Sequence, residues 1–337
     1  MNILYIGNYG AGKTTRARGE AIKKLLGEDK VDVIDTEVPL KRAWRPVRSF
    51  GFRYKKGPLL DNINRYILEN ISGDYDVIWV DKGVFIFRET VKKLKERTKI
   101  LLHYTPDAAF YENRSRHFKE GIELYDFLVS TKNFEKDKYL EFVPEEKLIL
   151  TTQGYDASVH YPRNEFKEKE ECCAFVGLYE SSRGKAVSGL LRAGVCVKIA
   201  GKGWNRFVRR HKGSKLTCLG EALWLDKYAA LISRAKFGLG FLNKSFPEKH
   251  TTRTFEIPAC GTALVTERNE ETSSFFNEDE AIFYDTPGEM VEKIRYYMVH
   301  SDELEELTCK GRERVVGGGF DYESQIRDIF KRIGALA

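Results

Sequence analysis

Short apolar segments rich in β-formers alternate with amphipathic helical segments along the whole chain. This alternation limits the fold more than any other feature, because strands that are apolar on both faces must be covered by helices on both faces. It therefore predicts parallel, doubly wound sheets of the α/β class. The strands expected in the first half span 2–7, 31–37, 75–83, 99–107, 125–131 and 147–154, and the helices span 16–27, 61–71 and 86–97.

The second half repeats this design. Its expected strands span 171–177, 195–201, 215–220, 237–242 and 262–267, and its expected helices span 182–194, 223–235, 252–261, 287–300 and 323–335. A polar, aperiodic segment separates the halves, so we expect two Rossmann-like domains that face a central cleft. Their predicted bounds are 1–155 and 168–318, with 319–337 as a terminal helix that packs back towards the first domain. In such sheets, ligands bind at the carboxyl ends of the strands.

The composition agrees with two globular domains. The 337 residues are 42% hydrophobic and 31% charged, and no apolar run approaches the roughly 18 residues of a membrane span. The first residues read as a core strand without the basic and apolar stretches of a secretory leader, so we expect a cytoplasmic protein. The six cysteines show neither a CxxC motif nor zinc spacing, and we expect reduced core residues at positions 172, 173, 196, 218, 260 and 309.

Residues 7–14, GNYGAGKT, fit the pattern of a phosphate-binding loop. They follow a predicted strand and open a predicted helix, which is the context that such a loop requires. Asp81, at the end of another strand, could position Mg²⁺. The alternative is that any sheet of this kind needs glycines in its first strand-to-helix turn, with Lys13 a solvated residue at the helix start.

A pair of glutamates in the second half brackets a helix start. Glu248 lies in the loop after a strand, and Glu256 lies one turn into the next helix, with Thr252 and Arg253 between them. Free N–H groups and the Arg253 charge favour a phosphate there, and a carboxylate one turn later can accept hydrogen bonds from sugar hydroxyls. An ordinary helix with a surface glutamate is the alternative.

Other strand ends supply matching groups. Arg183 and Lys185 stand at the start of the next helix, where two cations suit a diphosphate. Three glycines, at positions where the backbone turns or approaches a ligand closely, end the strands of this half: Gly177, Gly201 and Gly220.

Residues 41–56 form the one stretch whose charge indicates a partner. They hold seven Lys and Arg residues, no acid and four aromatic residues, within a chain of net charge +6. This composition suits nucleic acid, an anionic glycan or a lipid headgroup, and the alternative is a solvated surface loop. The residues expected to bind this partner, which would be the acceptor if the chain transfers a group, are Trp44, Arg45, Arg48 and Arg53.

Motifs spread over nearly the whole chain resemble those of GT-B glycosyltransferases, most of all the CgeB-like (spore maturation protein) family. They are NILYIGNYG, VDKG, LLHYTPD, YDFLVSTK, QGYDASVHYP, FVG with Arg183, IAGKGW and, most specific, RTFEIPACG at 253–261. The chain departs from the family at 320–322, where FDY replaces an HTY-like triplet, and in carrying Lys13 and Thr14.

The resemblance implies a transferase that moves a hexose or pentose from a UDP- or GDP-linked donor, with no cofactor beyond that co-substrate. Glu256 would hold the ribose, and Glu248 would lie near the donor sugar. Arg183, Lys185 and the helix start at Thr252 and Arg253 would bind the diphosphate. Leu219 and Gly220 would meet the base. In the first domain, Gly10 and Gly12 would approach the diphosphate, and His103 and Asp107 would face the sugar or the acceptor.

Positive side chains and helix starts would stabilise the departing diphosphate. The sequence shows no clear DxD cluster, so no metal is expected, and the E-x7-E spacing is more typical of retaining enzymes. Three alternatives stay open at this point. They are a P-loop kinase or NTPase that uses residues 7–14, a glycosyltransferase that acts on nucleic acid, and a non-catalytic module that binds an anionic polymer through residues 41–56.

Overall fold

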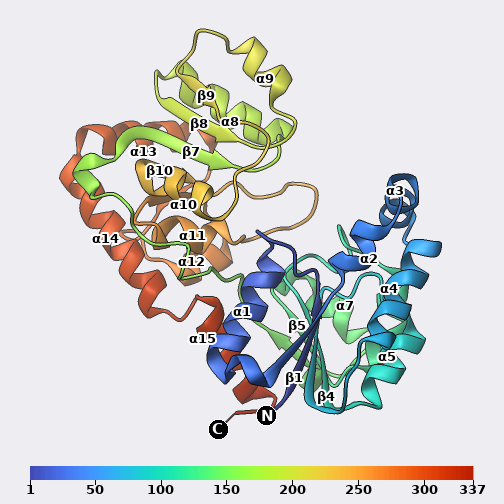
Figure 1. Cartoon of the computed structure of the whole chain (residues 1–337). Helices are drawn as coiled ribbons and strands as arrows, with labels where there is room; N and C mark the ends of the chain where they lie inside the picture. Colours follow the sequence, from blue (N-terminus) through green and yellow to red (C-terminus); the bar gives the residue numbers. More distant parts are fainter. Residues whose placement is uncertain (337) are drawn as a thin grey trace. The chain divides into compact units, whose positions relative to one another are not determined.

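A computed structural model of the chain describes residues 1–336, which form two compact units. The first unit comprises residues 1–152 together with 322–337, and the second comprises 153–321. Each unit holds one six-stranded sheet in which every neighbouring pair of strands is parallel (Figure 1). The α/β class expected from the sequence is therefore confirmed. Short 3₁₀ turns lie at Glu28–Lys30, Ile122–Leu124, Asn133–Glu135, Glu145–Lys147 and Phe166–Glu168.

The first unit has the strand order β2-β1-β3-β4-β5-β6. Its strands are β1 Ile3–Gly7, β2 Val31–Asp35, β3 Tyr75–Asp81, β4 Thr98–Thr105, β5 Phe127–Ser130 and β6 Leu148–Leu150. Its helices are α1 Thr14–Leu26, α2 Glu37–Arg42, α3 Arg45–Tyr54, α4 Pro58–Glu69, α5 Arg88–Lys95, α6 Arg116–Gly121, α7 Lys136–Leu140 and α15 Tyr322–Arg332.

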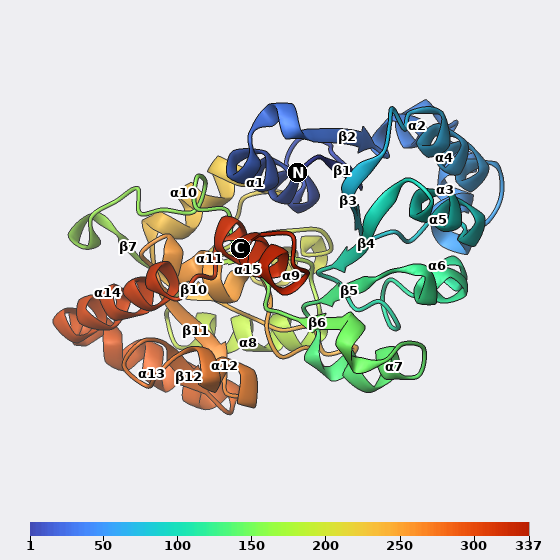
Figure 2. The ribbon, with the colours of Figure 1, turned by 90° about the horizontal axis from the view of Figure 1, so that it is seen from below.

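Alternate residues of these strands point to two separate cores. Ile3 and Tyr5 pack with α1 and α15 on one face, whereas Leu4 and Ile6 pack with α4 to α7 on the other. Helix α15 lies beside α1 although about three hundred residues of chain separate them (Figures 1 and 2). The last helix thus completes the cover of the first sheet.

The second unit has the strand order β12-β11-β10-β7-β8-β9. Its strands are β7 Glu170–Val176, β8 Cys196–Ala200, β9 Leu216–Cys218, β10 Ala235–Leu239, β11 Ala263–Glu267 and β12 Ile282–Tyr284. Its helices are α8 Ser181–Arg192, α9 Asn205–Arg210, α10 Leu225–Arg234, α11 Arg253–Ala259, α12 Glu270–Phe275, α13 Pro287–Val299 and α14 Ser301–Gly317. Helices α8, α9 and α13 cover one face, and α10 and α11 cover the other.

Three sequence-based expectations need correction. The basic stretch 41–56 is largely helical rather than a solvated loop, because it contains the end of α2 and the whole of α3. Two of the six cysteines, Cys218 and Cys309, are exposed rather than in the core, one on the short edge strand β9 and one on α14. Helix α14 was not expected, because a single residue, His300, separates it from α13 and gives no loop signal.

One ion pair is fully enclosed in the first unit. The Arg18 guanidinium on α1 donates from Nε and Nη2 to the two carboxylate oxygens of Asp81, at 2.7 and 2.9 Å. The Tyr5 hydroxyl donates to the same carboxylate at 2.7 Å. The rings of Tyr104 and Tyr322 lie 4.8 and 5.6 Å from the guanidinium carbon. This buried charge pair therefore ties α1, α15 and three strands together.

Removing one partner of this pair should strongly destabilise the first unit. Arg18→Met leaves the Asp81 carboxylate buried without its counter-charge, which costs about 3–5 kcal/mol. We expect a lower midpoint in denaturant unfolding followed by circular dichroism. The double variant Arg18→Met with Asp81→Leu removes both charges and should recover a large part of the loss. Equal destabilisation of the single and double variants would contradict a strong Arg18–Asp81 coupling.

Candidate donor-binding site in the second unit

Two arginines meet at the carboxyl end of β7. Arg183 stands in the first turn of α8, directly after the loop that follows this strand, and Arg253 is the first residue of α11. Both guanidinium carbons lie 5.6 Å from the centre of the Phe175 ring. Residues 70 positions apart in the chain thus place two positive charges around one aromatic side chain.

The two guanidinium groups are held by backbone carbonyls. Arg183 donates to the carbonyl of Leu178 at 3.0 Å, and Arg253 donates to the carbonyl of Phe241 at 3.2 Å. Each also has a buried Nε atom for which residues 1–336 offer no hydrogen-bond partner. Both arginines therefore keep donor capacity that an anion could use.

Arg183 is buried between an acidic partner and a second cation. Its side chain is only 6% exposed and pairs with Glu180 at 2.8 Å. Burial, followed by the Arg253 charge, lowers the Arg183 pKa, while Glu180 and Glu248 act in the opposite direction. Two positive groups that repel each other would be stabilised by a bound dianion such as a diphosphate.

The structure does not bring Lys185 to this pair. Positions two apart on a helix point to different sides, and Lys185 is exposed whereas Arg183 is buried. Their closeness in the chain had favoured the prediction that both bind the diphosphate. The second cation at Arg183 is instead Arg253, which a different strand-to-helix connection supplies.

Of the E-x7-E pair, Glu248 acts on the charge of Arg183, and Glu256 lies one turn after Arg253 on α11. Glu248 accepts a hydrogen bond from the backbone N–H of Asn243 at 2.8 Å, which closes the loop after β10. Glu256 is 9% exposed, and its Oε1 lies 3.8 Å from Nε2 of His160. Thr252, which precedes α11, accepts the Glu256 backbone N–H at 2.9 Å. Its side chain does not cap the helix.

Tyr228 on α10 is a residue that the sequence analysis missed. Its buried hydroxyl has no hydrogen-bond partner among the residues that the structure describes. Burial, followed by the nearby Glu256 carboxylate, raises the Tyr228 pKa well above its usual value. A single tyrosine inside an amphipathic helix carries no sequence signal for such a position, because only the fold brings it to Glu256.

The glycines of this edge are required by close backbone contacts. The N–H groups of Gly177 and Gly201 donate to the carbonyls of Ala200 and Gly220, each at 2.9 Å. A Cβ atom on Gly201 would lie 1.8 Å from the carbonyl oxygen of Gly177, and its φ of +146° also excludes other residues. Backbone hydrogen bonds therefore connect the residues that follow β7, β8 and β9.

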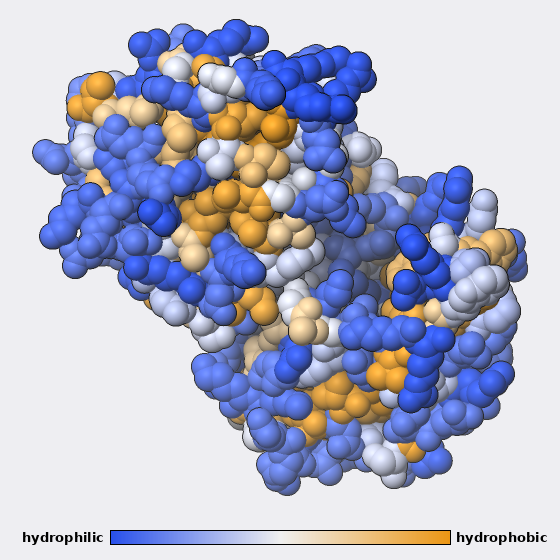
Figure 3. Space-filling view, turned by 45° about the horizontal axis from the view of Figure 1, so that its top comes forward, coloured by the Kyte–Doolittle hydropathy of each residue, from blue (hydrophilic) through white to orange (hydrophobic). Residues whose placement is uncertain are grey.

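Two exposed apolar side chains follow the end of β9. Leu219 is 43% exposed, and Trp224, which the sequence analysis did not single out, is 63% exposed. Figure 3 shows hydrophobic residues exposed among hydrophilic ones on the face that it presents. An aromatic ring and a leucine beside polar strand ends are suited to the flat face of a base or a sugar.

In the first unit, the strand ends hold different chemistry. Gly10 packs against Glu37, where a Cβ atom would lie 2.1 Å from a carboxylate oxygen, and Gly12 has a φ of +77°. Asp81 is 4% exposed, and its carboxylate accepts from Arg18 and Tyr5, with the Thr15 hydroxyl at 3.5 Å. A carboxylate so enclosed is a poor ligand for the Mg²⁺ of an NTPase.

His103 is enclosed rather than presented to a ligand. It is 1% exposed and stacks on Phe118 with ring centres 4.4 Å apart. Its Nε2 lies 3.1 Å from the carbonyl of Lys82, which fixes Nε2 as the protonated nitrogen. Lys82 has a left-handed backbone (φ +70°), and its Nζ pairs with Asp107 at 2.7 Å. His103 thus holds the strand end that positions Asp107.

Asp107 is ion-paired and partly exposed. It accepts a hydrogen bond from Asn113 at 2.7 Å in addition to the Lys82 pair. Although burial acts to raise it, the Lys82 ammonium keeps the Asp107 pKa below its usual value. As it stands, this carboxylate is a weak base.

The remaining expected residues lie on α3 or directly before it. Trp44 is 74% exposed, Arg45 and Arg53 lie at the two ends of the helix, and Arg48 lies between them. Within residues 1–336, no cluster of three or more His, Cys, Asp or Glu side chains is placed to hold a metal ion. The same residues include no helix long and apolar enough to cross a membrane.

Comparisons with known proteins agree with this arrangement. A family model described as "Glycosyl transferase-like" matches residues 184–331. HepE of Anabaena, solved in complex with UDP-glucose, is similar over 100% of both chains, with 13% identity and a TM-score of 0.65. Sucrose-phosphate synthase of Thermosynechococcus elongatus is similar over 100% of both chains, with 13% identity and a TM-score of 0.67. No curated protein matches the chain in sequence.

A third solved structure has the same fold. The α,α-trehalose 6-phosphate synthase of Burkholderia multivorans covers 99% of this chain with 97% of its own, at 10% identity and a TM-score of 0.62. The fold is therefore the GT-B fold, as expected, and the family match agrees with the glycosyltransferase class. The finer resemblance to CgeB-like proteins is not named in these comparisons and stays a prediction.

The buried His103 ring predicts a measurable pH dependence of stability. Burial lowers its pKa from 6.5 to about 4 in the folded chain. As the pH falls from 6.5 to 4, the unfolded chain binds a proton that the folded chain does not, so stability decreases by up to about 3 kcal/mol. His103→Gln keeps an N–H donor but cannot titrate. In denaturant unfolding at several pH values, wild type should lose more stability than this variant. Parallel profiles would contradict the prediction.

Proposed function

We propose that the chain is a glycosyltransferase that moves a sugar from a nucleoside-diphosphate sugar to an acceptor hydroxyl, with the donor bound by the second unit. The arginine pair around Phe175 carries the proposal. Two cations with free donor capacity at a strand end suit a diphosphate group. The GT-B fold and the glycosyltransferase-like family match support the same reading.

In the proposed reaction, the acceptor oxygen attacks the anomeric carbon of the donor sugar. The bond from that carbon to the β-phosphate oxygen breaks, the nucleoside diphosphate leaves with the bonding electron pair, and the acceptor proton passes to a carboxylate base, for which Asp107 is the candidate. Negative charge develops on the leaving diphosphate. Arg183 and Arg253 would stabilise this charge in a largely buried setting, where each interaction is stronger than in water.

The neighbouring residues receive matching roles in the proposal. Glu256, with Tyr228 beside it, would hold the ribose hydroxyls, and Glu248 would contact the donor sugar. Leu219, Gly220 and Trp224 would meet the base, since they follow β9 and are exposed. Gly177 and Gly201, which have no side chain, would let the backbone approach the diphosphate closely. Thr252 would lie near it as the residue before Arg253.

The finer points of the proposal rest on narrower observations. HepE was solved with UDP-glucose, so a UDP-linked hexose is the first donor to test. The E-x7-E spacing of Glu248 and Glu256 favours retention at the anomeric carbon. Asp107 is kept as a candidate base for the acceptor, provided that Lys82 moves away from it during the reaction.

Loss of one arginine of the pair should selectively weaken donor binding. Charge-assisted hydrogen bonds contribute about 1.5–3 kcal/mol, so Arg253→Ala and Arg183→Ala should each bind a UDP-sugar at least tenfold more weakly. Isothermal titration calorimetry measures this directly. Lys185→Ala is the matched control, because it removes an exposed cation two positions from Arg183. Equal losses in Arg183→Ala and Lys185→Ala, or no wild-type binding to any nucleotide sugar, would refute the proposal.

The arginine pair also predicts the response to a chelator. If these side chains supply the positive charge for the leaving group, transfer should continue in excess EDTA after dialysis against the chelator. Sugar release from the nucleotide, followed as free UDP, is the measurement. Activity that disappears with EDTA and returns with Mg²⁺ or Mn²⁺ would show that the arginines are not sufficient.

A further inference from the structure

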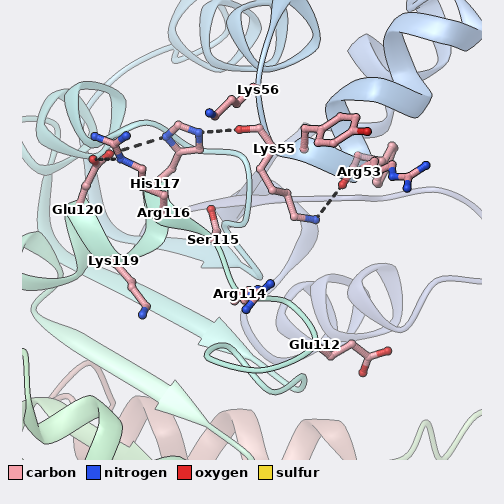
Figure 4. Close-up of a pocket in the computed structure, with 12 residues that line it drawn as sticks. Arg53, Lys55, Lys56, Glu112, Arg114, Ser115, Arg116, His117, Lys119 and Glu120 are labelled. Carbon is pink, nitrogen blue, oxygen red and sulfur yellow. Dashed lines mark hydrogen bonds and ion pairs between the residues drawn. The ribbon is translucent and has the colours of Figure 1, made fainter. Parts of the chain in front are cut away.

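A basic cavity lies within the first unit and is lined by residues of that unit alone. Its volume is about 950 Å³, and two segments line it: the end of α3 with the residues after it, and the segment 112–120 (Figure 4). Six Lys and Arg side chains face two glutamates there. The lining cations are Arg53, Lys55, Lys56, Arg114, Arg116 and Lys119. The sequence analysis assigned only the first segment to a partner.

Most of this charge is not neutralised within the protein. Arg116 pairs with Glu120 at 2.6 Å. For Arg53, Lys55, Lys56 and Arg114, no carboxylate lies within ion-pair distance in the described part of the chain. The Lys119 ammonium lies 5.6 Å from the centre of the Phe110 ring, which carries no formal charge. A concave surface that concentrates unpaired cations attracts a polyanion.

The backbone at Lys55 is held in an unusual conformation that shapes the cavity. Lys55 has a left-handed φ of +51°, which is uncommon for a residue with a side chain. Its carbonyl lies 2.9 Å from Nε2 of His117, and its Nζ donates to the carbonyl of Phe52 at 3.2 Å (Figure 4). Burial lowers the Lys55 pKa, which is the cost of a half-buried cation without an acid. A bound anion would offset that cost.

Aromatic rings line the same cavity. Phe52 and Tyr54 are 44% and 53% exposed, and the Arg53 guanidinium lies 5.5 Å from the Tyr54 ring. One helical turn before Tyr54, the Phe50 ring packs against the Tyr54 ring in a tilted arrangement, with ring centres 4.9 Å apart. Aromatic rings interleaved with Arg and Lys are the combination that binds single strands, because bases stack on rings while phosphates contact the cations.

The cavity also adjoins the strand ends of its own sheet. The segment that lines it continues from the loop after β4, where Asp107 pairs with Lys82 and Asn113. The hydroxyl of Ser115 donates to the carbonyl of Val84 at 2.6 Å, which ties this loop to the end of β3. In sheets of this kind, the loops after the carboxyl ends of strands form ligand sites.

We propose that this cavity binds a single-stranded nucleic acid and, resting on the proposed function, that such a strand is the sugar acceptor. Aromatic rings that lie between the cations favour a strand over a membrane surface, because a strand offers both bases and phosphates. The exposed rings of Phe52 and Tyr54 favour a nucleic acid, because planar bases stack on aromatic side chains. The basic segment 41–56 then acts together with 112–120 rather than alone.

Binding of a fluorescein-labelled oligothymidylate, followed by fluorescence anisotropy at several salt concentrations, tests the proposal. Four unpaired cations predict a slope of log K against log salt of about −3, since each contact with a single strand contributes about −0.7. Lys56→Ala with Arg114→Ala should weaken binding and make the slope shallower by about 1.4. Tyr54→Ala should weaken binding on the order of tenfold without changing the slope.

The control is Lys92→Ala with Lys93→Ala, which removes two exposed lysines of α5 that do not line the cavity. Equal losses in the two double variants would overturn the proposal, because general charge would then explain binding. Competition by dextran sulfate as strong as that by unlabelled oligothymidylate, with no effect of Tyr54→Ala, would assign the cavity to anionic glycans. Capture by phosphatidylserine vesicles in place of the oligomer would assign it to a membrane.

Donor binding separates this proposal from the preceding one. The cavity variants should bind a UDP-sugar as wild type does, which also shows that they are folded. Oligothymidylate binding without any donor binding would leave the cavity assignment standing and remove the transferase. Donor binding without oligothymidylate binding would leave the transferase proposal standing and remove the cavity assignment.

Discussion

Parallel pairing of every strand is the constraint on which both halves of this protein depend. Because all strands of a sheet point the same way, every loop that follows a strand emerges at one edge. In the second unit this edge brings together Arg183, from the connection after β7, and Arg253, from the connection after β10. In the first unit it brings together Lys82 and Asp107. Residues distant in the chain become neighbours there without any local sequence motif.

The protein places its cations in three different environments, and the environment decides the role of each. Arg18 is enclosed with Asp81 and stabilises the fold. Arg183 and Arg253 lie on Phe175 with carbonyls as partners and retain buried donors, which suits an anionic ligand held firmly. Lys56 and Arg114 line an open cavity in which cations outnumber the two glutamates, which suits a long, exchangeable polyanion. A cation paired with a buried carboxylate thus stabilises the fold, whereas a cation with unused donors can bind a ligand.

Much of the architecture was predictable because it follows from local periodicity. The expected strands at 75–83 and 171–177 correspond to β3 and β7, and the expected helix at 287–300 corresponds to α13. Helix α3 was not predicted, although its apolar residues Val47, Phe50 and Tyr54 recur at helical spacing, because the density of Arg and Lys favoured a solvated stretch. In the structure this helix packs against α4.

The sequence by itself determined the two parallel sheets, the glycines at the strand ends and the short set of residue types that could bind a diphosphate. These depend on hydrophobic periodicity and on backbone conformations that only glycine adopts, both of which are local properties. Tertiary structure alone decided which of these residues meet. It joined Arg183 to Arg253 rather than to Lys185, enclosed His103, brought Tyr228 to Glu256, and added the segment 112–120 to the basic stretch. The reason is physical: proximity in space depends on which strand ends share an edge and which helix faces are buried, and neither is encoded at any single position.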